Sequence, residues 1–274
     1  MAREVAVVPH THWDREWYEP FEAYRMRLAG VVDGLLQLMG TGEAPPHFHL
    51  DGQVAVLDDY VAIRPAAEAR LADLVGSGRL AVGPWYVLMD EFCVSAETIV
   101  RNLELGLARG RRFGADRPGA CRPVGYLPDM FGHIAQMPQM LRQAGIDEAV
   151  VWRGVPAAIG CHSFDWVAPD GSRVRAEYLP VGYAAGAFLP KDGPSLVRRM
   201  EAHEREIASF YRDDEAILLM NGGDHQAPQA WLTRLLSDAN AGNDRFRFVA
   251  TSLAGYLSSG ARAGGEWMGE LRSG

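Results

Sequence analysis

Short apolar runs alternate along the chain with longer segments whose apolar residues recur at helical spacing. Residues 5–8 form the first run, and residues 21–39 form the first helical segment, with apolar side chains at Met26, Val31, Leu35 and Leu38. Further strand-like runs lie at residues 48–50, 80–82, 123–127, 149–152, 217–220 and 246–250. Repeated strand–helix units predict a parallel sheet covered by helices.

Three more helices and one hairpin complete the predicted elements. Ser95 is a suitable N-cap for a helix that runs through Leu107. The remaining helices are expected at residues 198–210 and 231–239. Residues 164–178 form two alternating runs around the Asp170-Gly171 pair, which predicts a β-hairpin.

The number of strand–helix units favours a closed barrel over an open sheet. About seven units predict a single α/β domain over residues 1–274, a seven-stranded parallel (β/α) barrel with the hairpin inserted after one strand. Glycines follow several strands without forming a GxGxxG or GKS pattern. A dinucleotide site or a phosphate loop therefore has no support.

Composition and charge narrow the partners and the compartment. The chain is 48% hydrophobic and 23% charged, as is typical of globular proteins, and its formal net charge of -8 argues against nucleic acid or an anionic membrane as partner. Cys93, Cys121 and Cys161 share no CxxC spacing, which favours a reducing compartment. With no signal-peptide pattern and no membrane-length apolar run, we expect a cytoplasmic protein and leave a homo-oligomer open.

Polar side chains follow several of the predicted strands. In a parallel barrel the active site lies at the carboxyl ends of the strands, so these groups should converge. They are His10, His12, Asp14, Asp129, Arg153, Asn221, Asp224 and His225. Such a set is typical of a metal-assisted hydrolase.

His12 and Asp14 are the strongest metal ligands in this set. Imidazole and carboxylate suit a divalent ion such as zinc, and the indole of Trp17 offers a flat face to a sugar ring. Alternatively, Asp14 pairs with a neighbouring arginine or caps the next helix. His10 is either a residue that supports the ligands or one that contacts substrate.

Asp129 lies in the segment Gly125-Tyr-Leu-Pro-Asp-Met-Phe-Gly-His133. A structural alternative is that it caps a helix beginning near Ile134. A cap residue directly precedes the first turn, and Asp129 lies several residues too early. The position favours a catalytic role.

Four motifs together resemble a known enzyme family. They are His10-Thr-His-Trp-Asp14, the segment around Asp129, Val151-Trp-Arg153 and Asn221-Gly-Gly-Asp-His225. In order and spacing over nearly the whole chain they are similar to the N-terminal catalytic domain of the glycoside hydrolase family 38 α-mannosidases.

The resemblance implies a seven-stranded α/β barrel that holds one zinc ion and retains configuration through a mannosyl-enzyme intermediate. His12 and Asp14 match zinc ligands, and Asp129 matches the residue that is both ligand and nucleophile. Trp17 and Arg153 match residues of the sugar pocket. Further substrate contacts are expected from His10, Phe131 and His225.

A retaining glycosidase also needs a carboxyl group that protonates the leaving oxygen. Where better-known family members carry two adjacent aspartates, this chain has Asp224-His225, and we assign Asp224 as acid/base. The alternative for Asp224, which stays open, is a turn residue after two glycines. Asp51, Asp90 and Glu91 also follow predicted strands and remain candidates.

Residues 269–274 resemble the start of the segment that supplies the family's fourth zinc ligand. We therefore expect the chain to be truncated, without downstream helical and β-sandwich domains.

Three functions are compared. The first is a zinc-dependent retaining α-mannosidase acting on terminal α-mannosides of a glycan or glycoside. The second is a metal-dependent amidohydrolase-type barrel, because His10-Thr-His12 is also an HxH pair; its bridging lysine is missing, since Lys191 is the only lysine. The third is a carbohydrate-binding fragment without turnover.

Overall fold

The computed structural model describes residues 2–259 and 263–273, so Met1 and Gly274, the two ends of the expected domain, lie outside the described residues. The strands are β1 Arg3–Pro9, β2 Phe48–His49, β3 Leu80–Ala81, β4 Gly125–Leu127, β5 Glu148–Val151, β6 Ser163–Val167, β7 Arg173–Tyr178, β8 Ile217–Asn221, β9 Phe246–Ala250 and β10 Glu266–Met268. The α-helices are α1 Phe21–Thr41, α2 Ala55–Ile63, α3 Glu68–Gly76, α4 Ala96–Arg112, α5 Met137–Gln143, α6 Gly193–Ile207, α7 Leu232–Ala241 and α8 Leu253–Ser258. Short 3₁₀ turns are η1 Pro65–Ala67, η2 Glu91–Cys93 and η3 Ala157–Ile159.

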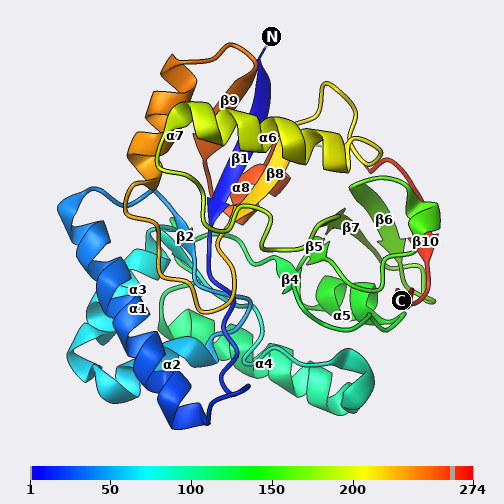
Figure 1. Cartoon of the computed structure of the whole chain (residues 1–274). Helices are drawn as coiled ribbons and strands as arrows, with labels where there is room; N and C mark the ends of the chain where they lie inside the picture. Colours follow the sequence, from blue (N-terminus) through cyan, green and yellow to red (C-terminus); the bar gives the residue numbers. More distant parts are fainter. Residues whose placement is uncertain (1, 260–262, 274) are drawn as a thin grey trace.

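The fold is α/β with mixed sheets. The strands form a three-stranded sheet ordered β8-β1-β9, a two-stranded sheet of β2 and β3, and a five-stranded sheet ordered β10-β6-β7-β5-β4. In Figure 1, β1 runs through the middle of the molecule, with α1, α2 and α3 to its lower left, the five-stranded sheet to its right and α4 along the bottom.

A closed seven-stranded parallel barrel is not confirmed. Among the described strands, no ladder joins β3 to β4 or β7 to β8. β2 and β3 have only two residues each, which is too short to carry a continuous ladder around a barrel. A single bridge between His10 and His49 continues the pairing from β1 to β2.

The predicted hairpin is present, but it is part of the sheet instead of an insertion beside it. β6 and β7 pair antiparallel, with Phe164 opposite Ala176, and the connection turns at Gly171, whose φ is +85°. β7 also pairs in parallel with β5, with Val151 opposite Tyr178. The carboxyl end of β7 therefore opens onto the same edge as the other parallel strands.

The predicted helices form, with ends set by their caps. The Ser95 side chain accepts a hydrogen bond from the Thr98 amide at the start of α4. α6 begins at Gly193, earlier than predicted, because the Asp192 side chain caps it through the Ser195 amide. Within the part of the chain that the structure describes, no helix combines the length and apolar character needed to cross a membrane.

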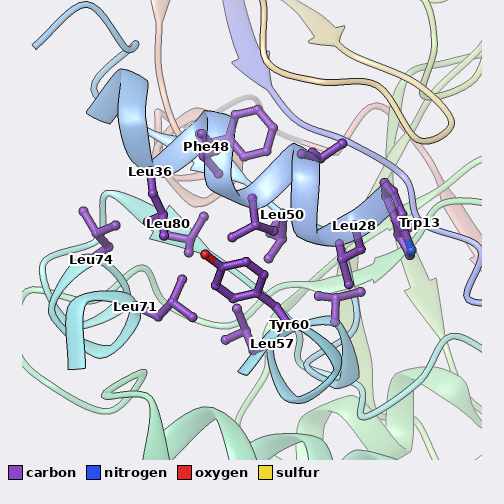
Figure 2. Packing of buried hydrophobic residues seen from close by; sticks show 14 of the residues in the cluster. Trp13, Leu28, Leu36, Phe48, Leu50, Leu57, Tyr60, Leu71, Leu74 and Leu80 are labelled. Carbon is purple, nitrogen blue, oxygen red and sulfur yellow. The ribbon is translucent and has the colours of Figure 1, made fainter. Parts of the chain in front are cut away.

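One large apolar cluster anchors the segment that follows β1 to the rest of the fold. Figure 2 shows Trp13 and Leu28 with side chains from the two-stranded sheet and from α2 and α3. Trp13 is only 1% exposed, so this indole is part of the core and not of a sugar pocket. Full burial of a side chain of this size anchors the residues on either side, His12 and Asp14.

Candidate active site

Beyond Pro9 the chain continues alongside the end of β8. The His10 amide donates to the Asn221 carbonyl over 3.0 Å, and the His12 amide donates to the Gly223 carbonyl over 3.1 Å. At Gly222 the two segments are in such close contact that a Cβ atom would lie 1.9 Å from the His10 carbonyl oxygen. Only glycine fits there, and this close approach brings the polar groups after β1 and β8 together.

His12 lies among three carboxylates. Its side chain is almost wholly buried, with Nε2 3.6 Å from Asp14 Oδ1 and 3.9 Å from Asp129 Oδ2. Its other nitrogen, Nδ1, is 3.5 Å from Asp51 Oδ1. Burial disfavours the charged imidazole, but the carboxylates of Asp51 and Asp14 outweigh it and raise the pKa of His12 well above its usual value.

Asp51 is a buried support for His12. Its carboxylate accepts hydrogen bonds from the Trp13 amide at 3.0 Å, the Gly52 amide at 2.7 Å and Gln53 Nε2 at 2.9 Å. Burial opposes its charge, but His12 and these donors lower the pKa of Asp51. A fully enclosed carboxylate cannot reach a leaving group, so Asp51 is wrong as an acid/base candidate.

Asp14 is held by His225. The Asp14 amide donates to His225 Nε2 over 3.1 Å, and the imidazole packs between Trp13 and Tyr24. Burial is outweighed by His12 and His225, which hold the pKa of Asp14 well below its usual range. His225 has a positive φ of +55° and does not line the cleft; the predicted sugar contact is replaced by support of Asp14.

Asp129 and Arg153 form an ion pair at the ends of β4 and β5. Asp129 Oδ1 accepts from Arg153 Nη2 at 2.7 Å and from Nε at 2.9 Å. The guanidinium lies 3.9 Å from the Trp152 ring centroid and 4.5 Å from that of Phe131. Burial raises the pKa of Asp129, and Arg153 opposes this rise by stabilising the carboxylate.

Asp224 bonds to a residue that the sequence interpretation did not identify. Tyr183 donates its hydroxyl proton to Asp224 Oδ1 over 2.8 Å, and its ring packs 4.9 Å from that of His12. The Tyr183 carbonyl is 2.8 Å from His10 Nε2. His10 is 1% exposed and lies beneath the cleft, which corrects its assignment as a substrate contact.

The two other acid/base candidates have different positions. Asp90 lines the cleft and accepts the Phe131 amide over 2.8 Å. Glu91 is buried and binds His133 Nδ1 at 2.6 Å and the Ile134 amide at 2.8 Å. Glu91 is therefore wrong as an acid/base candidate, because no ligand can reach its carboxylate.

These groups surround a cleft of about 360 Å³. Trp17 and Phe131 line it and are 72% and 65% exposed. The lining residues are His12, Asp14, Trp17, Leu88, Met89, Asp90, Asp129, Met130, Phe131, Arg153, Tyr183 and Asp224. Carboxylates that flank exposed aromatic faces are suited to a sugar, whose polar edge and apolar face need both.

Comparison with known proteins identifies the family. Residues 2–264 match the model for the glycosyl hydrolases family 38 N-terminal domain. The chain belongs to glycoside hydrolase family 38.

Three family 38 relatives show the extent of the similarity. A protein of Halalkalibacterium halodurans, named provisionally as a mannosylglycerate hydrolase, is 37% identical over 94% of this chain and 30% of its own length. Alpha-mannosidase 2C1 of Homo sapiens is 30% identical over 62% of this chain and 16% of its own length. The crystal structure of an alpha-mannosidase from Enterococcus faecalis V583 superposes with a TM-score of 0.91, at 31% identity, over 99% of this chain and 31% of that one. The chain thus spans less than a third of the length of these relatives.

The family 38 motifs supply donors of the kind that zinc prefers. Within residues 2–259 and 263–273, no three His, Cys, Asp or Glu side chains converge closely enough to enclose a metal ion. Tetrahedral zinc separates its donor atoms by about 3.4 Å, and His12 Nε2 lies 3.6 and 3.9 Å from oxygens of Asp14 and Asp129. The donor types therefore fit the ion, and His12 lies near both carboxylates, but the three side chains do not close around one point.

The sequence interpretation missed Tyr183 because it treated β7 as a hairpin outside the parallel sheet. Had β7 been counted as a parallel strand, the rule of carboxyl ends would have led to the segment after Tyr178 and so to Tyr183. The sequence pattern predicts Asp51 only as a possible acid, because spacing along the chain does not show which carboxylates are buried.

Proposed function

We propose that this family 38 domain contributes the catalytic centre of a zinc-dependent retaining α-mannosidase. The observation that carries the proposal is the cleft in which Asp129, paired with Arg153, faces His12 and Asp14 while Asp224 lies on the same lining. We propose mannose as the sugar because these relatives are named alpha-mannosidases.

The proposed chemistry has two steps. A carboxylate oxygen of Asp129 attacks the anomeric carbon as the bond to the leaving oxygen breaks, and Asp224 gives that oxygen a proton. Asp224 then takes a proton from water, which displaces Asp129 with a second inversion and so restores the original configuration. Arg153 keeps Asp129 ionised for the attack.

Charge balance supports a cation in the cleft. Asp14, Asp90, Asp129 and Asp224 line it, and Arg153 is the one arginine or lysine among its described lining residues. His12, Asp14 and Asp129 would hold zinc, which supplies positive charge and sugar-hydroxyl coordination when bound. The family assignment leaves the amidohydrolase alternative without support.

The test combines metal content with hydrolysis of 4-nitrophenyl α-mannoside. We expect zinc near one equivalent and activity that a chelator removes and zinc restores. Zinc-bound protein that binds mannose but never releases nitrophenol would contradict catalysis by this chain and support a carbohydrate-binding function without turnover.

A charged substrate is the second candidate, and the 37% identity to the protein named as a mannosylglycerate hydrolase favours it. A glycerate carboxylate needs a cation, whereas Arg153 already pairs with Asp129. Comparing kcat/KM for mannosylglycerate and methyl α-mannoside decides between an anionic and a neutral aglycone.

A further inference from the structure

Residues 269–273, here called the strap, lie across the two loops that follow β4 and β5. The Leu271 amide donates to the His133 carbonyl over 3.0 Å, and the His133 amide donates to the Leu271 carbonyl over 2.8 Å. Further along, the Ser273 amide donates to the Gly154 carbonyl over 2.9 Å. The strap thus joins the loop that follows Asp129 to the loop that follows Arg153.

Asp129 and Arg153 lie between two places where their backbone segments are connected, first directly and then through the strap. The ladder of β4 and β5 ends with Leu127 opposite Val151, so each catalytic-site residue comes two positions after the last pair. The next backbone connection between the two loops, among the described residues, passes through the strap. The ion pair therefore occupies a span that is closed at both ends.

Two glycines make the fit at the strap close. A Cβ atom on Gly132 would lie 2.9 Å from the Leu271 carbonyl oxygen, and one on Gly154 would lie 2.5 Å from it. Both glycines have positive φ, +108° and +81°. The Leu271 carbonyl thus lies between the backbones of Gly132 and Gly154. A larger residue at either position would collide with it.

The strap is itself fixed to the scaffold. β10 directly precedes it and pairs in parallel with β6, at the sheet edge where Figure 1 shows the chain's end. The Gly269 amide donates to the Val167 carbonyl over 3.1 Å, and Trp166 Nε1 donates to the Gly269 carbonyl over 2.8 Å. Leu271 is fully buried in the same apolar cluster as Trp166. A segment held in this way can resist movement of the two loops.

We propose that Leu271 and Ser273 are positioning residues, which set the separation of the Asp129 and Arg153 loops and so align Asp129 for attack. The proposal rests on the proposed function of Asp129. It adds that two residues distant in sequence from Asp129 and Arg153 control the catalytic step more than substrate binding.

Ser273→Pro tests the strap with little risk to the fold, because Ser273 is exposed and the change removes the one amide that bonds to Gly154. Ser273→Ala is the matched control, since it keeps that amide. We expect Ser273→Pro to lower kcat by about tenfold or more with KM within about twofold, as misalignment does, and Ser273→Ala to match the parent.

A second readout does not depend on turnover. Arg153 Nε donates to Asp129 Oδ1, so its N–H signal in ¹⁵N-arginine NMR, assigned by its loss in Arg153→Lys, reports the ion pair. Ser273→Pro should shift or broaden this signal, and Ser273→Ala should not. If Ser273→Pro proves poorly folded, Leu271→Ala against Leu271→Met replaces the pair.

The two readouts separate the strap from the proposed function. A parent chain that is inactive with zinc contradicts catalysis by this chain alone, and the Arg153 signal then decides on the strap. Parent-like kcat together with an unchanged Arg153 signal in Ser273→Pro would overturn the positioning role.

Discussion

Asp129 is the residue on which the account of this site depends most. Its carboxylate is half-buried, accepts two hydrogen bonds from Arg153 and lies 3.9 Å from His12. Burial makes it a better nucleophile by removing water, and Arg153 keeps it charged. A half-buried carboxylate that is held ionised by an arginine is suited to nucleophilic attack.

Asp129→Asn should lower kcat on 4-nitrophenyl α-mannoside by more than about a thousandfold, because an amide cannot form the glycosyl ester. Asp244→Asn is the matched control, since Asp244 is exposed and does not belong to the cleft lining. Turnover of Asp129→Asn within tenfold of the parent would remove Asp129 from the nucleophile's role.

Asp224→Ala should lose far less activity on 4-nitrophenyl α-mannoside than on methyl α-mannoside, because nitrophenolate leaves without a proton. Tyr183→Phe removes the hydrogen bond to Asp224 and should show the same preference more weakly. The measurement is kcat/KM on both substrates. Equal losses on both would assign the acid/base to another group.

Buried histidines should make stability depend on pH. Burial lowers the pKa of His10 and His49 to about 4, below the usual 6.5, so the unfolded chain takes up protons first as the pH falls. The free energy of unfolding is therefore highest above pH 6.5 and decreases towards pH 4, by at most about 3 kcal/mol for each histidine.

His49→Leu should remove its share of this dependence, since among the described residues neither ring nitrogen of His49 has a hydrogen-bond partner. Urea unfolding between pH 7.5 and 4.5 measures it, with the half-buried His47→Gln as control. A parent-like pH slope in His49→Leu would show that His49 is not the group responsible.

At the scale of elements, one glycine in α4 and one glycine in α1 have opposite surroundings. Gly106 lies in α4 against the loop after β3, where a Cβ atom would come 2.1 Å from the Pro84 carbonyl oxygen. Gly30 lies in α1 facing open space. Helix propensity alone would predict that alanine stabilises both positions.

Gly106→Ala should instead destabilise the protein by about 1–3 kcal/mol, because α4 must move away from the loop. Gly30→Ala should stabilise it by about 0.5–1 kcal/mol. Thermal and urea unfolding of the pair measure both changes. Equal and favourable effects would show that α4 does not pack as closely as described.

Most strands and four of the eight described α-helices followed from their sequence patterns, whereas α2, α3, α5 and α8 are short and were not predicted by range. The start of α6 depends on Asp192, a cap outside the apolar pattern. β7 looked like half of an independent hairpin, because alternation predicts a strand but not its partners. The pairing of β7 with β5 is a tertiary contact that only the fold reveals.

For the whole molecule, strand order explains why Asp129, Arg153 and Asp224 could be predicted to meet. Each follows a parallel strand, and the carboxyl ends of such strands share one edge. Closure of the barrel was not predictable in this way, since β2 and β3 are too short to pair widely. Which histidines reach the cleft depends on packing, and His10 and His225 turned out to support their neighbours.

The proposed zinc site involves several elements of the fold. If zinc binds as proposed, His12→Ala should release it, because His12 is the one nitrogen donor among the proposed ligands. Elemental analysis after gel filtration measures this, with His203→Ala as a control remote from the cleft. Parent-like zinc content in His12→Ala would contradict the assigned ligand.

The most direct test of the central claim is covalent trapping. The zinc-loaded chain is incubated with 5-fluoro-α-mannosyl fluoride, whose departing fluoride speeds the first step while the ring fluorine slows the second, and its peptides are then weighed. The account predicts one sugar adduct, on the peptide that contains Asp129 and at that carboxylate. An adduct on another carboxylate, or fluoride release without any adduct, would contradict it.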